Sequence, residues 1–303
     1  MFRSILLAAL AVISLSSAAR AEDRVRLGYG RLLTNDSFGD VHDRWQTGSV
    51  ASSRIWGRGW SGRAPERPFE LLELRLGVQV MAPGDLRQPD PKDRPFAGAL
   101  SLGLHTHFSR GDLDWTLGGD LVVTGPQTRL GDLQTAMHDS VGAVTVPPSV
   151  LDDQVKDGLH PTLVAEAGRE LDFGRARLRP FAEARLGAES LLRAGVDLTL
   201  GRVGQGELLV RDPVTGQRYR VITDPVPGMA LVFGADIAHV AESAFLPESS
   251  GADLRATRER LRAGLHWQGD RMALFYGLTW LGREFDAQPE GQLVGSLRLQ
   301  VSF

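Results

Sequence analysis

Cysteine is absent from the 303 residues, so the chain must obtain its rigidity from something other than disulfide bonds. An excess of charge of one sign is also missing, because the formal net charge is only -3 at pH 7. Electrostatics therefore gives no support for a nucleic-acid partner. The sequence also lacks the phosphate-binding glycine loop, the ligand spacing of zinc sites and the Gly-x-Ser-x-Gly element. We expect no nucleic-acid ligand and none of these standard sites.

Long apolar runs are missing after the first residues of the chain. Arg3, the apolar run at residues 5–15 and the sequence Ala-Arg-Ala at 19–21 match the three parts of a secretory signal peptide. The same run could be a permanent membrane anchor, but it is too short to span a bilayer as a helix. We predict that residues 1–21 are removed during export and that residues 22–303 form one domain.

No later stretch contains about 18 consecutive apolar residues, so the exported chain has no transmembrane helix available. It is therefore either soluble or crosses a membrane as strands. The last residues, LRLQVSF, alternate between apolar and polar side chains, which is the period-two pattern of a strand with two different faces. The apolar face of this strand consists of Leu297, Leu299, Val301 and Phe303.

Similar alternation recurs in about twelve segments of roughly ten residues, the length that a tilted strand needs to cross a bilayer. Some connections are short, such as 110–112 and 174–175, whereas 83–96, 203–226 and 241–254 are long. Short turns at one end and long loops at the other are typical of outer-membrane barrels. The predicted strands cover residues 24–33, 47–58, 71–82, 97–109, 112–123, 161–171, 176–186, 191–202, 227–240, 255–267, 271–282 and 292–303.

These features predict an all-β protein, a twelve-stranded antiparallel transmembrane β-barrel in the outer membrane of a Gram-negative cell. A soluble β-sandwich would also give alternating strands. The many arginines and aspartates on the inward faces argue against the sandwich. The final Phe303 resembles the signature by which outer-membrane barrels are recognised for assembly, so the barrel assembly machinery is an expected partner.

One segment, residues 125–142, breaks the strand pattern. Its apolar side chains recur at helical spacing, while the polar ones fall mostly elsewhere on the helical wheel. Gly125 and Pro126 end the preceding strand, and Thr128 is placed to cap a helix. A single short helix in a barrel protein must lie against the wall or across an opening. The apolar positions are Leu130, Leu133, Met137 and Val141.

The stretch TNDSFGDVHDRWQTGS, residues 34–49, carries more hydrogen-bonding and metal-binding groups than a hairpin turn needs. Taken one at a time, its residues have ordinary explanations. Asn35 and Asp36 favour a turn. Asp43 and Arg44 could form a surface ion pair of little energetic value. Taken together with sequences further along the chain, the same residues support another interpretation.

Four motifs occur in register with the strand pattern. They are TND at 34–36, DRWQTG at 43–48, DRPFAGALSLGL at 93–104 and VVTGPQTRLGDLQTAMH at 122–138. In this order they resemble the lipid A 3'-O-deacylase family of outer-membrane enzymes, the LpxR type. The resemblance covers residues 28–142 in its motifs and continues more loosely to the end of the chain.

The resemblance implies a twelve-stranded barrel, which agrees with the strand count obtained from the alternation. It also implies a calcium-dependent hydrolase that removes the 3'-linked acyloxyacyl chain of lipid A in the outer leaflet. The active site of the family lies where the barrel wall meets a short helix. Lipid A or lipopolysaccharide is thus the expected substrate and Ca²⁺ the expected cofactor, and we expect a monomer.

Carried over by motif, the functional residues of the family fall on Asn35, Asp36, Thr47, Gln134 and His138. We expect His138 to be the general base, since imidazole has a pKa suited to neutral pH. Asp36 is the leading calcium ligand, because Ca²⁺ takes carboxylate and other oxygen ligands in flexible geometry. Asn35 and Thr47 would orient the ester or complete the oxyanion site. Gln134, four residues before His138, would fix the water or the imidazole.

Some positions depart from the family or leave a choice open. Gln46 stands where relatives commonly have Tyr, and the segment between Asp36 and Asp43 is short. The basic residue that the family uses before the DRPFAG motif could be Arg87 or Lys92. These differences concern the substrate and leave the predicted fold unchanged.

Two other functions are compatible with parts of the sequence. A non-catalytic barrel, structural or a narrow pore, would not need His138, Asn35 and Asp36 to converge. An outer-membrane phospholipase would also use calcium, but it relies on a serine nucleophile, and no serine lies in such a motif. His105 and His107 share one strand face and could bind a metal, but no third ligand is nearby in sequence, so we expect them to be structural and to face inward.

Overall fold

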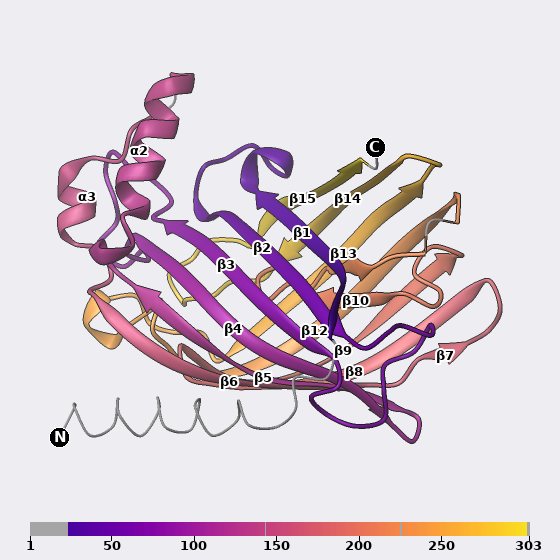
Figure 1. Cartoon of the computed structure of the whole chain (residues 1–303). Helices are drawn as coiled ribbons and strands as arrows, with labels where there is room; N and C mark the ends of the chain where they lie inside the picture. The colour runs from indigo at the N-terminus through magenta and orange to yellow at the C-terminus, as the bar shows by residue number, and fades with distance from the viewer. Residues whose placement is uncertain (1–23, 143, 225, 302–303) are drawn as a thin grey trace, which may run out of the picture.

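The computed structural model describes residues 24–142, 144–224 and 226–301. The predicted signal peptide and Phe303 lie outside these residues. Within them, twelve long antiparallel strands form one closed sheet (Figure 1). Their bounds are β1 (Val25–Asn35), β2 (Trp45–Gly57), β3 (Leu72–Ala82), β4 (Ala97–Arg110), β5 (Leu113–Thr124), β6 (Gly158–Gly168), β8 (Ala176–Leu186), β9 (Glu189–Gly201), β12 (Gly228–Ser243), β13 (Thr257–Gln268), β14 (Met272–Leu281) and β15 (Gln292–Val301).

Each long strand pairs with the next one along the chain, and the short β7 (Leu171–Asp172) lies in the connection between β6 and β8. The barrel closes where Leu33, Thr34 and Asn35 of β1 pair with β15. The predicted twelve-stranded antiparallel barrel is therefore confirmed. In such a wall the backbone groups satisfy one another, which is what allows strands to cross a membrane.

The alternation along the strands separates a polar interior from an apolar outer wall. On β8, Arg179 and Glu183 are buried inside the barrel, whereas Leu186 on the outer side is 63% exposed. An apolar outer band and a polar interior are expected of a membrane barrel and not of a sandwich. Inside, guanidinium and carboxylate groups pair across the lumen, as Arg211 does with Glu166 at 2.8 Å. The closed wall and these ion pairs replace disulfides as the source of rigidity.

The two ends of the barrel differ. We call the end where β1 begins and β15 ends the terminal end, and the opposite one the helix end (Figure 1). The sequence analysis placed the long segment 203–226 with the other long loops, but the structure corrects this, because β9 ends and β12 begins at the terminal end. From there the segment folds back into the lumen as a hairpin of β10 (Leu208–Arg211) and β11 (Arg218–Ile222).

The composition of the hairpin explains why it enters the barrel. Its apolar residues pack against apolar side chains on the inner wall near β1 and β2, which would otherwise face an open polar lumen. Tyr219 is completely buried, and its hydroxyl lies 2.6 Å from Ser53 Oγ. The hairpin therefore fills part of the lumen, which disfavours the pore among the alternatives. The packed residues include Leu32, Ile55, Leu71, Val210, Tyr219 and Val221.

Glycine makes room for this hairpin on the inner face of β1. A Cβ atom at Gly28 would overlap the carbonyl oxygen of Val221, and one at Gly30 would overlap that of Arg220. Both obstacles are backbone atoms, so they cannot move aside without shifting the hairpin.

We expect Gly28→Ala to destabilise the folded barrel by about 1–3 kcal/mol, the usual cost of forcing extra atoms into a packed interior. The measurement is the midpoint of denaturant-induced unfolding in detergent micelles. Gly119→Ala is the matched control, because its nearest neighbouring atom would lie 3.6 Å away. Equal midpoints for the two variants would show that the hairpin does not press on β1.

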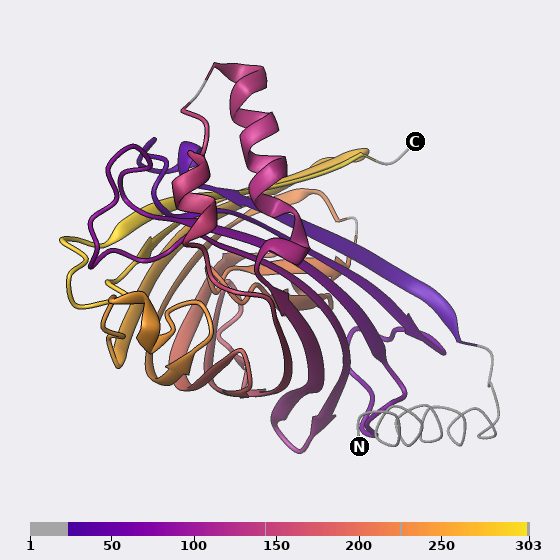
Figure 2. The ribbon, with the colours of Figure 1, turned by 90° about the vertical axis from the view of Figure 1, so that its left-hand side faces the viewer.

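The helices lie at the helix end, outside the strands, where they project beyond the rim (Figure 2). They are η2 (Asp36–Phe38), η3 (Pro126–Thr128), α2 (Leu130–Val141), α3 (Pro148–Asp152) and η4 (Glu248–Ser250), of which α2 and α3 project furthest. The N-cap position of α2 is Arg129, so the predicted cap Thr128 lies one residue too early. Within the described part of the chain, no helix is both long and apolar enough to cross a bilayer.

The contacts of α2 also differ from the expected amphipathic packing. Leu130 is buried against β4, where a Cβ at Gly98 would touch it. Leu133 and Met137, which we expected on the packed face, are 53% and 59% exposed. The helix is therefore held by its first turn and by the side that carries Gln134, which is also buried, while its apolar side chains Leu133 and Met137 face the surroundings.

Candidate active site at the barrel rim

The first part of the site is the turn that follows β1. Asn35 is the last residue of β1 and caps the short helix η2 (Asp36–Phe38). Its Oδ1 accepts a hydrogen bond from the backbone N–H of Ser37 at 2.9 Å, and its Nδ2 donates to the backbone oxygen of Thr47 at 2.9 Å. Both ends of the amide are thus engaged with backbone. Asn35 joins the turn to β2 instead of pointing freely toward a substrate.

The η2 turn is fastened to the outer side of β14 and β15. The hydroxyl of Tyr276 donates to the backbone oxygen of Phe38 at 2.9 Å. Gly295 lets the turn approach the wall, since a Cβ there would overlap the same oxygen. The backbone N–H of Asp40 donates to the oxygen of Leu293 at 3.0 Å. These contacts hold Asp36 in a fixed and almost completely buried position.

Asp36 is a buried carboxylate in an unfavourable electrostatic setting. It is 1% exposed, and its Oδ2 accepts a hydrogen bond from the backbone N–H of Arg44 at 3.2 Å. Burial, and then the nearby carboxylate of Asp43, raise the pKa of Asp36 to about 7. No described lysine or arginine forms an ion pair with Asp36. A bound cation would relieve this arrangement.

The second part of the site is a β-bulge at the start of β2. The pairing of β2 with β3 shifts between Gln46 and Gly48, so Thr47 is the extra residue. Bulges of this kind redirect a side chain and often occur beside active sites. Thr47 is 6% exposed, and its hydroxyl has no hydrogen-bond partner among the described residues.

The third part of the site is α2, which carries Gln134 and His138 on one face. Their Nε2 atoms are 3.5 Å apart. His138 Nδ1 lies 2.6 Å from the backbone oxygen of Val144, so this nitrogen carries the proton and donates it. Nε2 is then the basic nitrogen, and it lies 3.3 Å from Asp43 Oδ2. The imidazole is only 14% exposed and faces the β1–β2 loop.

The sequence-predicted residues therefore lie along one chain of contacts at the rim. Asn35 donates a hydrogen bond to the backbone oxygen of Thr47. The negative charge of Asp43 raises the pKa of Asp36, and Asp43 also contacts His138. Asp43 is the member that the sequence analysis missed. The possible Asp43–Arg44 ion pair does not form, because Arg44 pairs with Asp40 at 3.1 Å and with Glu290 at 2.8 Å. Only the position of α2 reveals the true partner of Asp43.

Several oxygen atoms in this area are buried and have no hydrogen-bond partner in the described chain. They are Asp43 Oδ1, Thr47 Oγ1 and Gln134 Oε1. No cluster of three or more acidic or histidine side chains suited to a metal occurs among the described residues. A metal here would therefore need hydroxyl, amide and backbone oxygens beside the carboxylates. Such a mixed oxygen set fits Ca²⁺, whereas Zn²⁺ prefers nitrogen and sulfur ligands.

Arg87 and Lys92, the two candidates for an additional basic residue, do not contact the other predicted site residues. Arg87 and Lys92 donate their backbone N–H groups to Asp85 and Asp90, and their side chains form no ion pair with any described residue. His105 and His107 face the lumen as we predicted. There they pair with Asp120 at 2.8 Å and with Glu73 at 2.7 Å, respectively.

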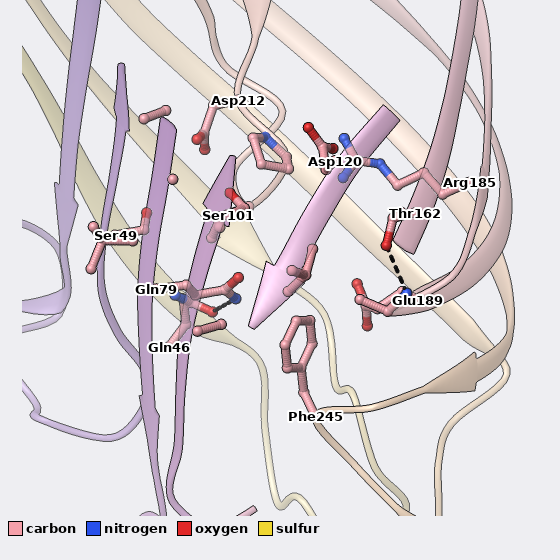
Figure 3. A pocket seen from close by; sticks show the side chains of 18 of the residues that line it. Gln46, Ser49, Gln79, Ser101, Asp120, Thr162, Arg185, Glu189, Asp212 and Phe245 are labelled. Carbon is pink, nitrogen blue, oxygen red and sulfur yellow. Dashed lines mark hydrogen bonds between the residues drawn. The ribbon is translucent and has the colours of Figure 1, made fainter. Parts of the chain in front are cut away.

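A separate cavity of about 120 Å³ lies inside the barrel (Figure 3). Gln46 and Gln79 meet at its edge, with Nε2 of Gln79 donating to Oε1 of Gln46 at 2.9 Å. None of the five predicted site residues lines this cavity. The candidate site therefore belongs to the outer side of the rim, beside α2, and not to the lumen.

Comparison with known proteins gives one family and one close fold. A family profile described as "Outer membrane protein LpxR" matches residues 5–303. The solved structure "LpxR from Salmonella typhimurium" superposes with a TM-score of 0.74 at 17% sequence identity, covering 91% of this chain and 100% of that chain. The KdgM porin and the NanC porin give TM-scores of only 0.40 and 0.39, each at 6% identity. They cover 92% and 91% of this chain, and 99% and 98% of their own chains. No curated protein sequence matches the chain.

Proposed function

The chain belongs to the LpxR family of outer-membrane proteins, and we propose that it is a calcium-dependent lipid A 3'-O-deacylase. It would hydrolyse the ester that links the 3'-acyloxyacyl chain to lipid A in the outer leaflet. One observation carries the proposal beyond the family. The imidazole of His138 lies 3.3 Å from Asp43, beside Gln134 and the η2 turn, although these residues come from distant parts of the sequence.

His138 has the geometry of a general base. With Nδ1 donating to the Val144 oxygen, Nε2 is the nitrogen that would take a proton from a water molecule that attacks the ester carbonyl carbon. Asp43 contacts this same nitrogen, so it would stabilise the imidazolium directly through an ion pair once Nε2 is protonated. The imidazolium would then return the proton to the departing sugar oxygen when the carbon–oxygen bond breaks. Gln134 would hold the ring or the water.

Thr47 and Asn35 would have different roles. The hydroxyl of Thr47 is buried without a partner, so it can donate to the ester carbonyl oxygen. Asn35 already uses its amide to hold the η2 turn against β2, and we assign it a positioning role. Of the two residues that we expect to orient the ester or complete the oxyanion site, only Thr47 would then contact the ester.

Calcium would be held by Asp36, with the free oxygens of Asp43, Thr47 and Gln134 as further candidate ligands. A bound calcium ion supplies positive charge that stabilises the negatively charged tetrahedral intermediate. Asp36 is buried beside Asp43, and no described lysine or arginine forms an ion pair with either carboxylate. That mismatch supports a cation as part of the functional state.

The proposed position in the membrane follows from the same features. The helix end would face the cell exterior, where lipid A forms the outer leaflet. The exposed Leu133 and Met137 on α2 would then contact acyl chains at the rim. We further propose that the chain acts as a monomer after export through its cleaved signal peptide and insertion by the barrel assembly machinery.

The decisive experiment incubates the purified protein in detergent micelles with lipid A and Ca²⁺ and follows the products by mass spectrometry. We expect the loss of one acyloxyacyl group from lipid A, while a phospholipid given as a parallel substrate stays intact. Cleavage of the phospholipid alone would instead favour the phospholipase. Two intact substrates would favour the non-catalytic barrel.

A further inference from the structure

A second cavity lies at the terminal end of the barrel, at the opposite end from the candidate active site. Its volume is about 520 Å³. It is lined by residues of loop 58–71, the turn after β6, the segment before β10, and the inner faces of β6 and β8. None of the residues of the proposed hydrolase site lines it. Any ligand of this cavity is therefore independent of the deacylase proposal.

Most charged side chains around the cavity already have partners. Glu166 accepts hydrogen bonds from Arg179 at 2.7 Å and from Arg211 at 2.8 Å. Glu183 accepts one from Arg185 at 2.6 Å. The remaining lining carboxylates are also bound: Asp112 by Arg169, Asp114 by Ser109, Asp172 by the N–H of Gly174, Glu207 by Arg220, and Glu170 by Arg177 at 3.8 Å.

Arg218 is the exception among these groups. Its guanidinium lines the cavity, and no described residue forms a hydrogen bond or an ion pair with it. It stands on β11 directly opposite Arg211 of β10, and it is close enough to Arg179 and Arg211 to be repelled by both. Asp197 and Glu166 are close enough to attract Arg218, but both carboxylates are hydrogen-bonded by other arginines, Asp197 by Arg211 and Arg262 and Glu166 by Arg179 and Arg211.

Arg179 is a second guanidinium that lines the same cavity. One of its terminal nitrogens binds Glu166, but its buried Nε has no partner. Leaving a buried donor of a charged group unpaired is costly. Two guanidinium groups of like charge that face one water-accessible space are best satisfied by an anion, because the planar guanidinium matches the oxygens of phosphate or carboxylate.

We propose that this cavity binds an oxyanion of the phosphate class, held by Arg218 and Arg179 inside the terminal end of the barrel. The phosphate could be free in solution or belong to a phospholipid headgroup at that membrane surface. In either case the hairpin β10–β11 supplies the central contact. Ligand binding would then also hold the hairpin in place.

The first test titrates inorganic phosphate into the full-length protein in non-ionic detergent and follows binding by calorimetry. We expect saturable binding that Arg218→Gln weakens about tenfold or more, because the variant removes the charge-assisted hydrogen bonds to the anion. Arg26→Gln is the control, since Arg26 is exposed at the same end and does not line the cavity. Equal phosphate binding by wild type and Arg218→Gln, or equal losses in both variants, would overturn the proposal.

The second test distinguishes the two sources of phosphate. The protein is placed in nanodiscs of phosphatidylglycerol or of phosphatidylcholine, and phosphate binding is repeated. If the natural ligand is a free anion, phosphate binds equally in both lipids. If it is an anionic headgroup, phosphatidylglycerol lowers phosphate binding, and Arg218→Gln loses retention of that lipid in native mass spectrometry. No effect of Arg218→Gln in either lipid would refute the site.

A folding check keeps these tests interpretable. Arg218→Lys retains the charge but not the planar fork, so we expect it to bind phosphate a few times more weakly than wild type. It replaces Arg218→Gln if the neutral variant does not give the folded barrel on a heat-modifiability gel. Lipid A deacylation should be unchanged in Arg218→Lys. If an Arg218 variant loses phosphate binding but keeps full deacylase activity, the result supports the phosphate site independently of the deacylase proposal. If the wild-type protein shows no deacylase activity, the result contradicts only the proposed active site at the helix end.

Discussion

Replacing His138 by alanine lowers kcat for lipid A deacylation by about 10²- to 10⁴-fold, the range that general base catalysis contributes. The reason is that Nε2 is the basic nitrogen of the site, and no other described imidazole faces the η2 turn from α2. KM should change little, because the lost interaction serves proton transfer and not binding. The measurement is the rate of product formation by mass spectrometry at saturating lipid A.

The matched control for His138 is His42→Ala. His42 lies in the same β1–β2 region but is exposed, and its ring nitrogen contacts only the backbone oxygen of Asp40. We expect its activity within about twofold of wild type, as is usual for exposed groups outside the chemistry. The activity of Asp43→Asn should lie between the activities of His138→Ala and His42→Ala, because the imidazolium loses its charged partner. If His138→Ala keeps full activity, the base lies elsewhere.

Removal of calcium has the second-largest expected effect. Chelation should reduce deacylation by about 10²- to 10³-fold, comparable with the loss of an oxyanion-stabilising group. Re-addition of Ca²⁺ should restore the rate. Asp36→Asn should raise the Ca²⁺ concentration needed for half-maximal activity at least tenfold, since the leading carboxylate ligand is gone. Full activity in the presence of chelator would remove calcium from the mechanism.

A stability measurement separates loss of a ligand from loss of the fold. In the metal-free protein the pKa of Asp36 is raised to about 7 by burial and by Asp43. Because the pKa of Asp36 is raised in the folded state, the barrel loses stability as the pH rises from about 4 to about 7, and the loss is complete above pH 7. The asparagine variant should be at least as stable there. Asp139→Asn, on the exposed side of α2, is the control and should keep the wild-type calcium response. A metal-free Asp36→Asn barrel that unfolds at pH 8 would contradict this account.

Most strand positions could be predicted from the sequence because each strand has one polar and one apolar face. β8 was predicted with its observed bounds, Ala176–Leu186. The predicted strand 161–171 begins three residues after the observed start of β6 at Gly158. In the structure Pro161 lies inside β6 beyond the pairing with β8, which starts at Leu163, so its missing N–H costs no bond on that side.

The site was predictable in its local parts only. The Asn35 cap of η2 spans two residues, and the Gln134–His138 pair spans one helical turn, so short-range rules suffice for both. The contact of His138 with Asp43 joins residues far apart in sequence, and no local pattern indicates it. The exposure of Leu133 and Met137 on α2 could not be predicted locally either, because it depends on how the helix packs against the barrel wall.

By itself, the sequence determined which side chains face the lumen and which face the membrane, because in a strand that choice depends only on odd and even positions. Only the tertiary structure decided that the hairpin β10–β11 turns inward, that Arg218 forms no direct ion pair with a described residue, and that Asp43 contacts His138. These are choices among many possible long-range partners. They are fixed only when the closed wall brings distant segments to one place.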